Sequence, residues 1–218
     1  MTTFGFSAFL KLLSLNPRPQ RREIRQRLSP TEGGYDFHRS LRLKSSRLMI
    51  DGEDLGGLID EAALLGNPAE RRSLESGLRL LSAWREANPG EVIAIPPTLY
   101  TSPAQRFKVS YVPDFGYHLG GHALAVHLWN TGTVNLVPRM TYVALAMVAS
   151  SYQGDVVPDD VAVLSLPENR LYRLSDVPDQ SRLAGIVAAN LDAIFENVRL
   201  EIIGERVPGE IGPRRDRV

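Results

Sequence analysis

The residues best suited to acid–base or metal chemistry gather in one stretch, Phe107 to Asn130. It holds three of the four histidines, one of the two tryptophans and a single acidic residue, Asp114. An imidazole beside a carboxylate can exchange protons near neutral pH, and both groups bind divalent cations. The chemistry that is open to this stretch depends on which of these side chains share a face.

The stretch reads as one antiparallel hairpin that turns at the glycine pair at positions 120 and 121. Two-residue hairpin turns need positive φ, which glycine adopts readily. The resulting register sets Asp114 opposite His127, and it sets Val112 opposite Trp129. Because side chains alternate along a strand, Asp114, His127 and Trp129 are expected on one face of the sheet.

The expected Asp114–His127 pair has two interpretations. A buried imidazole needs a hydrogen-bond partner, so the pair can be structural, and this interpretation is favoured. The same pair can act as a general acid/base dyad. A zinc site built from two or more of the hairpin histidines is disfavoured, since the register puts His122 on the opposite face from His127 and carries His118 far toward the turn.

The surrounding pattern predicts an α/β protein with a mixed central sheet flanked by helices. Asn67-Pro68 is a strong helix start, because asparagine caps a helix and proline suits its first position. We divide the chain into a basic helical arm (1–34), a single α/β domain (35–203) and a disordered tail (204–218). The expected helices are two short ones before residue 29 and others at 35–50, 53–65, 68–88, 138–152 and 178–203, and the expected strands are 91–100, 107–119, 122–130, 161–166 and 171–174.

Composition narrows the class of protein. The chain has 218 residues, of which 43% are hydrophobic and 23% charged, as in globular proteins that bury one core. It has no cysteine, which excludes disulfides, thiolate metal sites and thiol nucleophiles. No apolar run is long enough to span a membrane, and the basic residues follow the apolar N-terminal stretch instead of preceding it. We therefore expect a cytoplasmic protein.

The net charge of zero hides a basic N-terminal region. Residues 1–50 carry ten lysines and arginines against three acidic residues. Arginine forks suit phosphates, so the arm is a candidate nucleic-acid-binding segment; its arginines are Arg18, Arg21, Arg22, Arg25 and Arg27. The alternative is that the arm docks on acidic regions of the protein itself. A phenylalanine-rich helix at 4–13 could fold onto the body or bind a protein partner.

From residue 68 to residue 166 the expected order is helix, three strands, helix, strand. This order resembles the PD-(D/E)XK nuclease superfamily. Pro113-Asp114 ends the second strand, His127-Leu128-Trp129 lies on the third, and Asn130-Thr131-Gly132 follows where such nucleases often have Thr-Gly. As a whole, the chain also resembles an uncharacterised bacterial protein family.

The resemblance implies a nuclease scaffold with an altered site. Members of the superfamily have a carboxylate and a lysine where this chain has His127 and Trp129, and their carboxylates usually bind Mg²⁺. The leading expectation is a catalytically silent protein without a cofactor that acts by binding nucleic acid or a protein partner. The alternative is an active Mg²⁺-dependent phosphodiesterase whose site has migrated to Asp114, Glu75 and Lys108. A structural or regulatory partner-binding protein is the third possibility.

Overall fold

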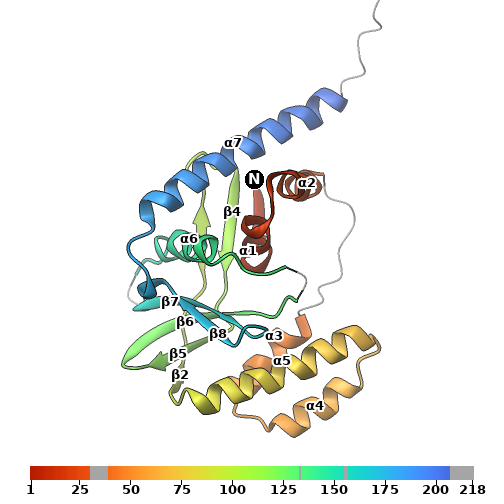
Figure 1. The fold of residues 1–218 in the computed structure, drawn as a ribbon, viewed down its shortest axis with the longest axis vertical. Helices are drawn as coiled ribbons and strands as arrows, with labels where there is room; N and C mark the ends of the chain where they lie inside the picture. The colour runs from red at the N-terminus through yellow and green to blue at the C-terminus, as the bar shows by residue number, and fades with distance from the viewer. Residues whose placement is uncertain (30–38, 133, 155–156, 207–218) are drawn as a thin grey trace, which may run out of the picture.

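The computed structural model describes residues 1–29, 39–132, 134–154 and 157–206. Figure 1 shows the arrangement of the helices and strands. In chain order the elements are β1 (Thr2–Gly5), α1 (Phe6–Ser14), α2 (Pro17–Leu28), α3 (Arg39–Met49), α4 (Leu55–Ala63), α5 (Pro68–Ala87), β2 (Glu91–Ile93), β3 (Thr98–Thr101), β4 (Phe107–Tyr111), β5 (Phe115–Leu119), β6 (His122–Trp129), α6 (Pro138–Ala149), β7 (Asp160–Ser165), β8 (Arg170–Arg173), a 3₁₀ turn η1 (Leu174–Asp176) and α7 (Ser181–Arg206).

Two mixed sheets organise these elements. The larger has the order β2-β5-β6-β7-β8, in which β6 and β7 are parallel and the other neighbours are antiparallel. The smaller has the order β1-β4-β3, with β1 parallel to β4. The prediction of an α/β protein with a mixed sheet is confirmed. The second sheet was not expected.

The prediction of one continuous hairpin from Phe107 to Asn130 is wrong in its first half. Only β5 and β6 pair, with the expected register around the turn, where Gly120 and Gly121 have φ of 60° and 84°. Strand β4 belongs to the smaller sheet. The chain changes sheet next to Pro113, which has no N–H and cannot continue a ladder. The predicted strand 91–100 divides in the same way at Pro96-Pro97, so β2 and β3 lie in different sheets.

Because β4 leaves the hairpin, Val112 does not face Trp129. Val112 is 59% exposed, whereas Trp129 is buried. The ladder resumes at Asp114, whose backbone N–H donates to the Val126 carbonyl oxygen at 2.8 Å. Asp114 therefore lies opposite His127, as the turn predicted, although it stands just outside β5.

The five-stranded sheet separates two cores (Figure 1). On one face, α5 packs through Leu74, Leu78, Leu81 and Trp84, with α3 and α4 beside it. On the other face lie α1, α6 and α7 together with the smaller sheet. Alternation along β6 assigns Leu124, Val126 and Leu128 to the first core and Ala125 and Trp129 to the second.

The N-terminal segment is part of the second core. Residues Thr2–Gly5 form strand β1, so the helix expected at 4–13 begins only at Phe6, as α1. Phe4 meets Phe195 of α7 edge-on, with ring centroids 5.8 Å apart, and Phe9 stacks on Phe107 at 5.8 Å. The phenylalanines that suggested a partner-binding helix are therefore buried within the protein itself.

The remaining helices lie close to their predicted positions. Helix α5 begins at Pro68, and the Asn67 side chain accepts hydrogen bonds from the N–H groups of Ala69 and Glu70. Helix α7 continues to Arg206, into the predicted tail, whose later residues fall outside the described part of the chain. No helix among the described residues combines the length and apolar character that crossing a bilayer requires.

Candidate functional site

Asp114 and His127 lie together between the two sheets. The Asp114 Oδ2 and His127 Nδ1 atoms are 3.0 Å apart, and the two side chains are 2% and 6% exposed. The predicted cross-strand pair is therefore confirmed. The carboxylate oxygen lies away from the N–H direction of the ring, so the contact is close but poorly directed as a hydrogen bond.

The backbone fixes the position of the carboxylate. Asp114 Oδ2 accepts a hydrogen bond from the Leu128 N–H at 2.7 Å, in addition to its contact with the imidazole. Residues 127 and 128 are neighbours on β6, so one carboxylate oxygen ties the start of β5 to that strand. A charged acceptor strengthens such a bond, which holds the buried aspartate in one orientation.

The other ring nitrogen of His127 meets a residue that the sequence did not suggest. Ser7 Oγ lies 2.7 Å from His127 Nε2. Ser7 is the second residue of α1, and this helix follows directly after Gly5, the last residue of strand β1. The contact spans 120 residues of sequence, so no local pattern predicts it. No signal in the sequence pointed to Ser7, because strand β1, which precedes its helix, was not expected.

Aromatic rings enclose the imidazole. The Phe6 ring meets His127 edge-on with centroids 5.2 Å apart, and the Tyr111 ring lies at 6.1 Å. The Tyr111 hydroxyl donates to the carbonyl oxygens of Ala125 and Ala162 at 2.6 and 3.2 Å, which joins the smaller sheet to the larger. Burial raises the pKa of Tyr111 well above its ordinary value near 10, and the charge of Asp114 adds to the effect.

Of the three residues in contact, Ser7, His127 and Asp114, Ser7 is the one that solvent can reach. It lines a small pocket, and the other lining residues are Leu41, Arg42, Leu128, Asn130 and Thr131. The interior of the pocket, about 10 Å³, is roughly the space of one water molecule. The Asn130 amide donates to the Ser73 carbonyl oxygen at 3.2 Å, which anchors one wall of the pocket to α5.

The structure does not bring Glu75 or Lys108 to Asp114. Glu75 belongs to α5, which covers the opposite face of the five-stranded sheet from His127. Lys108 lies on β4, where it alternates with residues that face the core around His127, and so points away from it. Among the described residues, no three acidic or histidine side chains are grouped so that they could hold a metal ion. The migrated metal site is not assembled.

The hairpin histidines also separate. His118 and His122 are both exposed near the turn, whereas His127 is 5% exposed at the far end of β6. Trp129, at the position where the nuclease resemblance expects a lysine, is 2% exposed in the core. Of the aspartate and the three histidines in this stretch, only Asp114 and His127 meet.

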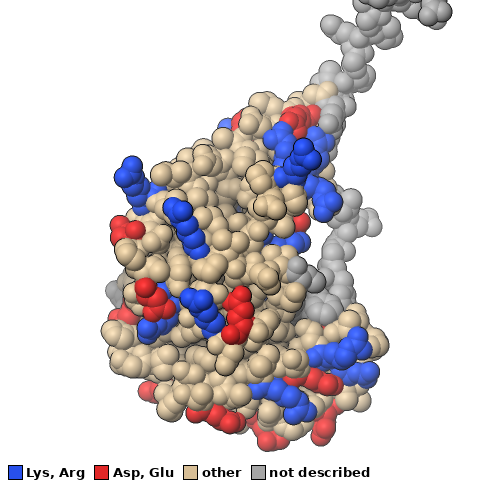
Figure 2. All heavy atoms as spheres, viewed as in Figure 1, with Lys and Arg blue, Asp and Glu red and all other residues tan. Residues whose placement is uncertain are grey.

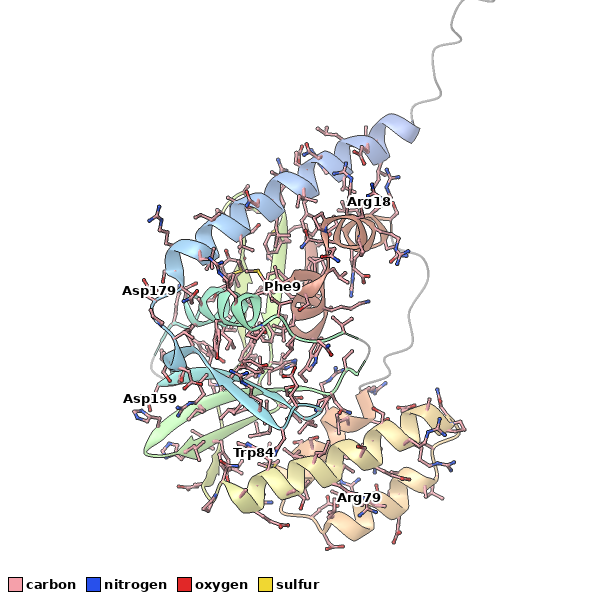
Figure 3. All side chains as sticks on the ribbon, viewed as in Figure 1. Phe9, Arg18, Arg79, Trp84, Asp159 and Asp179 are labelled. Atoms are coloured by element: carbon pink, nitrogen blue, oxygen red, sulfur yellow. The ribbon has the colours of Figure 1, made fainter. Side chains whose placement is uncertain are left out.

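The arginines predicted to bind nucleic acid lie on α2, which packs beside α7 (Figures 2 and 3). Arg21 and Arg25 form ion pairs with Glu201 of α7, and the Arg27 guanidinium lies 5.3 Å from the centroid of the Phe4 ring. Two of the five arginines, Arg21 and Arg25, are therefore docked on an acidic residue of the protein itself, which was the alternative to nucleic-acid binding. Arg18 and Arg22 are exposed, and within the described chain neither forms an ion pair or hydrogen bond.

Similarity to other proteins does not identify the site. The sequence matches no protein-family model, and comparison with curated proteins gives no match. The function is therefore inferred from the side chains and surfaces described above.

Proposed function

We propose that this protein is a nuclease-like scaffold that binds nucleic acid through α2 and does not cut it by a metal-dependent route. The observation that supports binding is the charge of α2, which has five arginines and one acidic residue, Glu23. Arg18 and Arg22 stand one helical turn apart with their side chains exposed. Figure 2 shows blue side chains gathered over this helix.

The sheet order supports the nuclease-like scaffold. Taking only the strands of the larger sheet, the chain runs α5, β2, β5, β6, α6, β7. This is helix, three strands, helix, strand, the order that the PD-(D/E)XK resemblance implies. Strands β3 and β4 are an insertion between the first and second core strands, and they pair with β1 to form the smaller sheet.

The residues at the reactive positions argue against metal-dependent cleavage. Magnesium prefers oxygen ligands, and here the position of the second carboxylate holds His127. The position of the lysine holds buried Trp129, which has no charged group to activate a water. His127 is already engaged by Asp114 and Ser7, so its nitrogens face protein atoms.

Arginines that have no partner in the protein bind phosphates best. An arginine already paired with a carboxylate gains little from a phosphate, because the phosphate must displace the carboxylate. Arg21 and Arg25 share Glu201, whereas Arg18 and Arg22 are open to solvent. We therefore assign the main phosphate contacts to Arg18 and Arg22, with the paired arginines supplying a weaker positive field.

A salt titration with a matched control tests this assignment. Binding of labelled single-stranded and duplex DNA is measured by fluorescence anisotropy, and the logarithm of the affinity is plotted against the logarithm of the salt concentration. Replacing Arg18 and Arg22 together by glutamine should weaken binding and reduce the slope by about 2. The control replaces Arg72 and Arg79, which are also exposed and belong to α5, a helix at the other end of the molecule from α2 (Figure 1).

Three results would reject the proposal. The first is absence of binding at low salt, and the second is equal loss in the two double variants. The third is cleavage of the DNA on addition of Mg²⁺ or Mn²⁺ that Asp114→Ala abolishes, which would establish the metal-dependent alternative.

A further inference from the structure

The geometry points to a second activity that the proposed DNA binding does not require: we propose that Ser7 is a nucleophile for acyl transfer, with His127 as its general base and Asp114 as the group that orients the imidazole. Ser7 Oγ is 2.7 Å from His127 Nε2, and His127 Nδ1 is 3.0 Å from Asp114 Oδ2. Serine, histidine and aspartate follow one another as in a catalytic triad, with the Ser7–His127 contact at hydrogen-bond distance and the carboxylate of Asp114 close to Nδ1 but not aligned with it.

A triad needs a nucleophile that a ligand can reach and a base and carboxylate that are shielded from water, and the three side chains are buried in that way. The Asp114 side chain is 2% exposed and that of His127 is 6% exposed, so bulk water has little access to the contact between them. Ser7 is half-buried and lines the pocket, so its hydroxyl can meet a ligand. A structural hydrogen bond would not need the hydroxyl to open onto a pocket.

The position of Ser7 on α1 supplies donors for a developing negative charge. The first N–H groups of a helix have no acceptor within the helix, and Ser7 and Ala8 lie in that first turn. Gly5, at the helix cap, offers no side chain to occupy them. These N–H groups and the positive end of the helix dipole can stabilise an oxyanion on a carbonyl that Ser7 attacks.

Hydrolysis of an ester by Ser7 needs only the ester and water. Ser7 Oγ attacks the carbonyl carbon of an ester while its proton passes to His127 Nε2. The tetrahedral adduct then collapses, the bond from the carbonyl carbon to the alcohol oxygen breaks, and His127 returns the proton to the leaving alcohol. Water, activated by the same nitrogen, hydrolyses the acyl-Ser7 ester and releases the carboxylic acid. The positive charge on the imidazole is stabilised by Asp114.

The pocket limits the acyl group. Its interior volume is near that of one water, and its apolar side chains are Leu41 and Leu128. The pocket has room for a water beside Ser7 but not for an acyl chain, so an acyl group on Ser7 would lie at the mouth of the pocket, where a short one is the easiest to place. We therefore assign short-chain carboxylic esters as the substrate class, and 4-nitrophenyl acetate is the matching probe.

The first test is covalent labelling of the folded full chain with a fluorophosphonate, followed by intact mass and peptide mapping. We expect one adduct, on Ser7, and none in Ser7→Ala. Ser14→Ala, in the same helix and equally half-buried, should be labelled like the wild type. His127→Ala should slow labelling at least about 100-fold. Release of 4-nitrophenol from the acetate should follow the same order across these variants.

The second test uses the absence of cysteine, because Ser7→Cys introduces the only thiol. A thiol beside Nε2 transfers its proton to the imidazole, so alkylation by iodoacetamide near pH 6 should be at least about tenfold faster for Ser7→Cys than for Ser14→Cys. This readout does not depend on whether His127→Ala folds.

Two results would overturn the inference: no Ser7 adduct in a folded wild-type protein, or equal alkylation rates for the two cysteine variants. Either result would leave the network with a structural role only. Ser7→Ala should bind DNA like the wild type, so failure of the acyl-transfer inference and failure of the nucleic-acid proposal can be told apart.

Discussion

Strand β6 presents apolar side chains to α5 on one face and an imidazole to α1 on the other. Against α5, the contacts are between leucine, valine and aromatic rings, and no polar side chain of β6 takes part. On the other face, His127 contacts Ser7 of α1 and Asp114, which stands just before β5. These contacts join polar atoms. The stability of the apolar face depends on how completely its side chains fill the space. The stability of the polar face depends on whether each buried polar atom keeps a partner.

The largest expected effect is on the apolar face. Leu78 is fully buried between α5 and the sheet, so Leu78→Ala should lower the free energy of unfolding by about 3 kcal/mol. Urea denaturation followed by circular dichroism measures it. Leu64→Ala, at a position 85% exposed, should change stability by less than about 0.5 kcal/mol. Equal effects at the two sites would contradict the description of this core.

Removing the Asp114 carboxylate should lower the free energy of unfolding slightly less than Leu78→Ala, and its effect should be coupled to that of His127→Ala. Asp114→Ala deprives the Leu128 N–H of its acceptor and removes the carboxylate beside the imidazole, and should lower stability by about 2 kcal/mol. Asp60→Ala, on an exposed face of α4, is the matched control and should be near neutral. In a double-mutant cycle with His127→Ala, additive effects would show that the two side chains do not interact.

Alkaline pH should destabilise the folded protein in part through Tyr111, which lies beside His127. Burial holds the pKa of the Tyr111 hydroxyl well above 10 in the folded protein, so the unfolded chain loses this proton first as the pH rises. The contribution is intact below pH 10 and is lost above it at about 1.4 kcal/mol per pH unit, until the folded pKa is reached. Tyr111→Phe should remove this part of the pH dependence. A variant that loses stability as steeply as the wild type above pH 10 would assign the effect elsewhere.

The smallest effect on stability should come from Ser7. Ser7→Ala removes one half-exposed hydroxyl, so the free energy of unfolding should fall by less than about 1 kcal/mol. The same substitution is expected to abolish labelling by a fluorophosphonate. A loss of more than about 2 kcal/mol would instead assign Ser7 to the support of the core.

Local signals predicted the elements that depend on local chemistry. The Asn67 cap located α5, and the glycine pair at 120 and 121 fixed the register that brings Asp114 to His127. Both signals act within a few residues, through backbone hydrogen bonds and positive φ. The apolar run of α6 and the amphipathic pattern of α7 were predictive for the same reason, since α6 is buried on most sides and α7 buries one stripe against the second core.

What the sequence did not predict depends on contacts between distant segments. Pro96-Pro97 marked a break but Pro113 was read as lying within a continuous strand, and only the pairing of the strands shows that the chain changes sheet at both places. At the N-terminus the short helix was expected, but strand β1 before it was not, because β1 pairs with β4, which is distant in the sequence. Ser7 was missed because its partner lies 120 residues away.

The most direct test of the site is the protonation of the His127 ring, measured by nitrogen-15 NMR on the folded protein at neutral pH. A carboxylate at Nδ1 and a donating serine hydroxyl at Nε2 predict a ring that carries its proton on Nδ1. Asp114→Asn should then shift the Nδ1 signal and Ser7→Ala the Nε2 signal, while the exposed His118 and His122 remain unchanged. A proton on Nε2, or a mixed tautomer that neither substitution alters, would contradict the account.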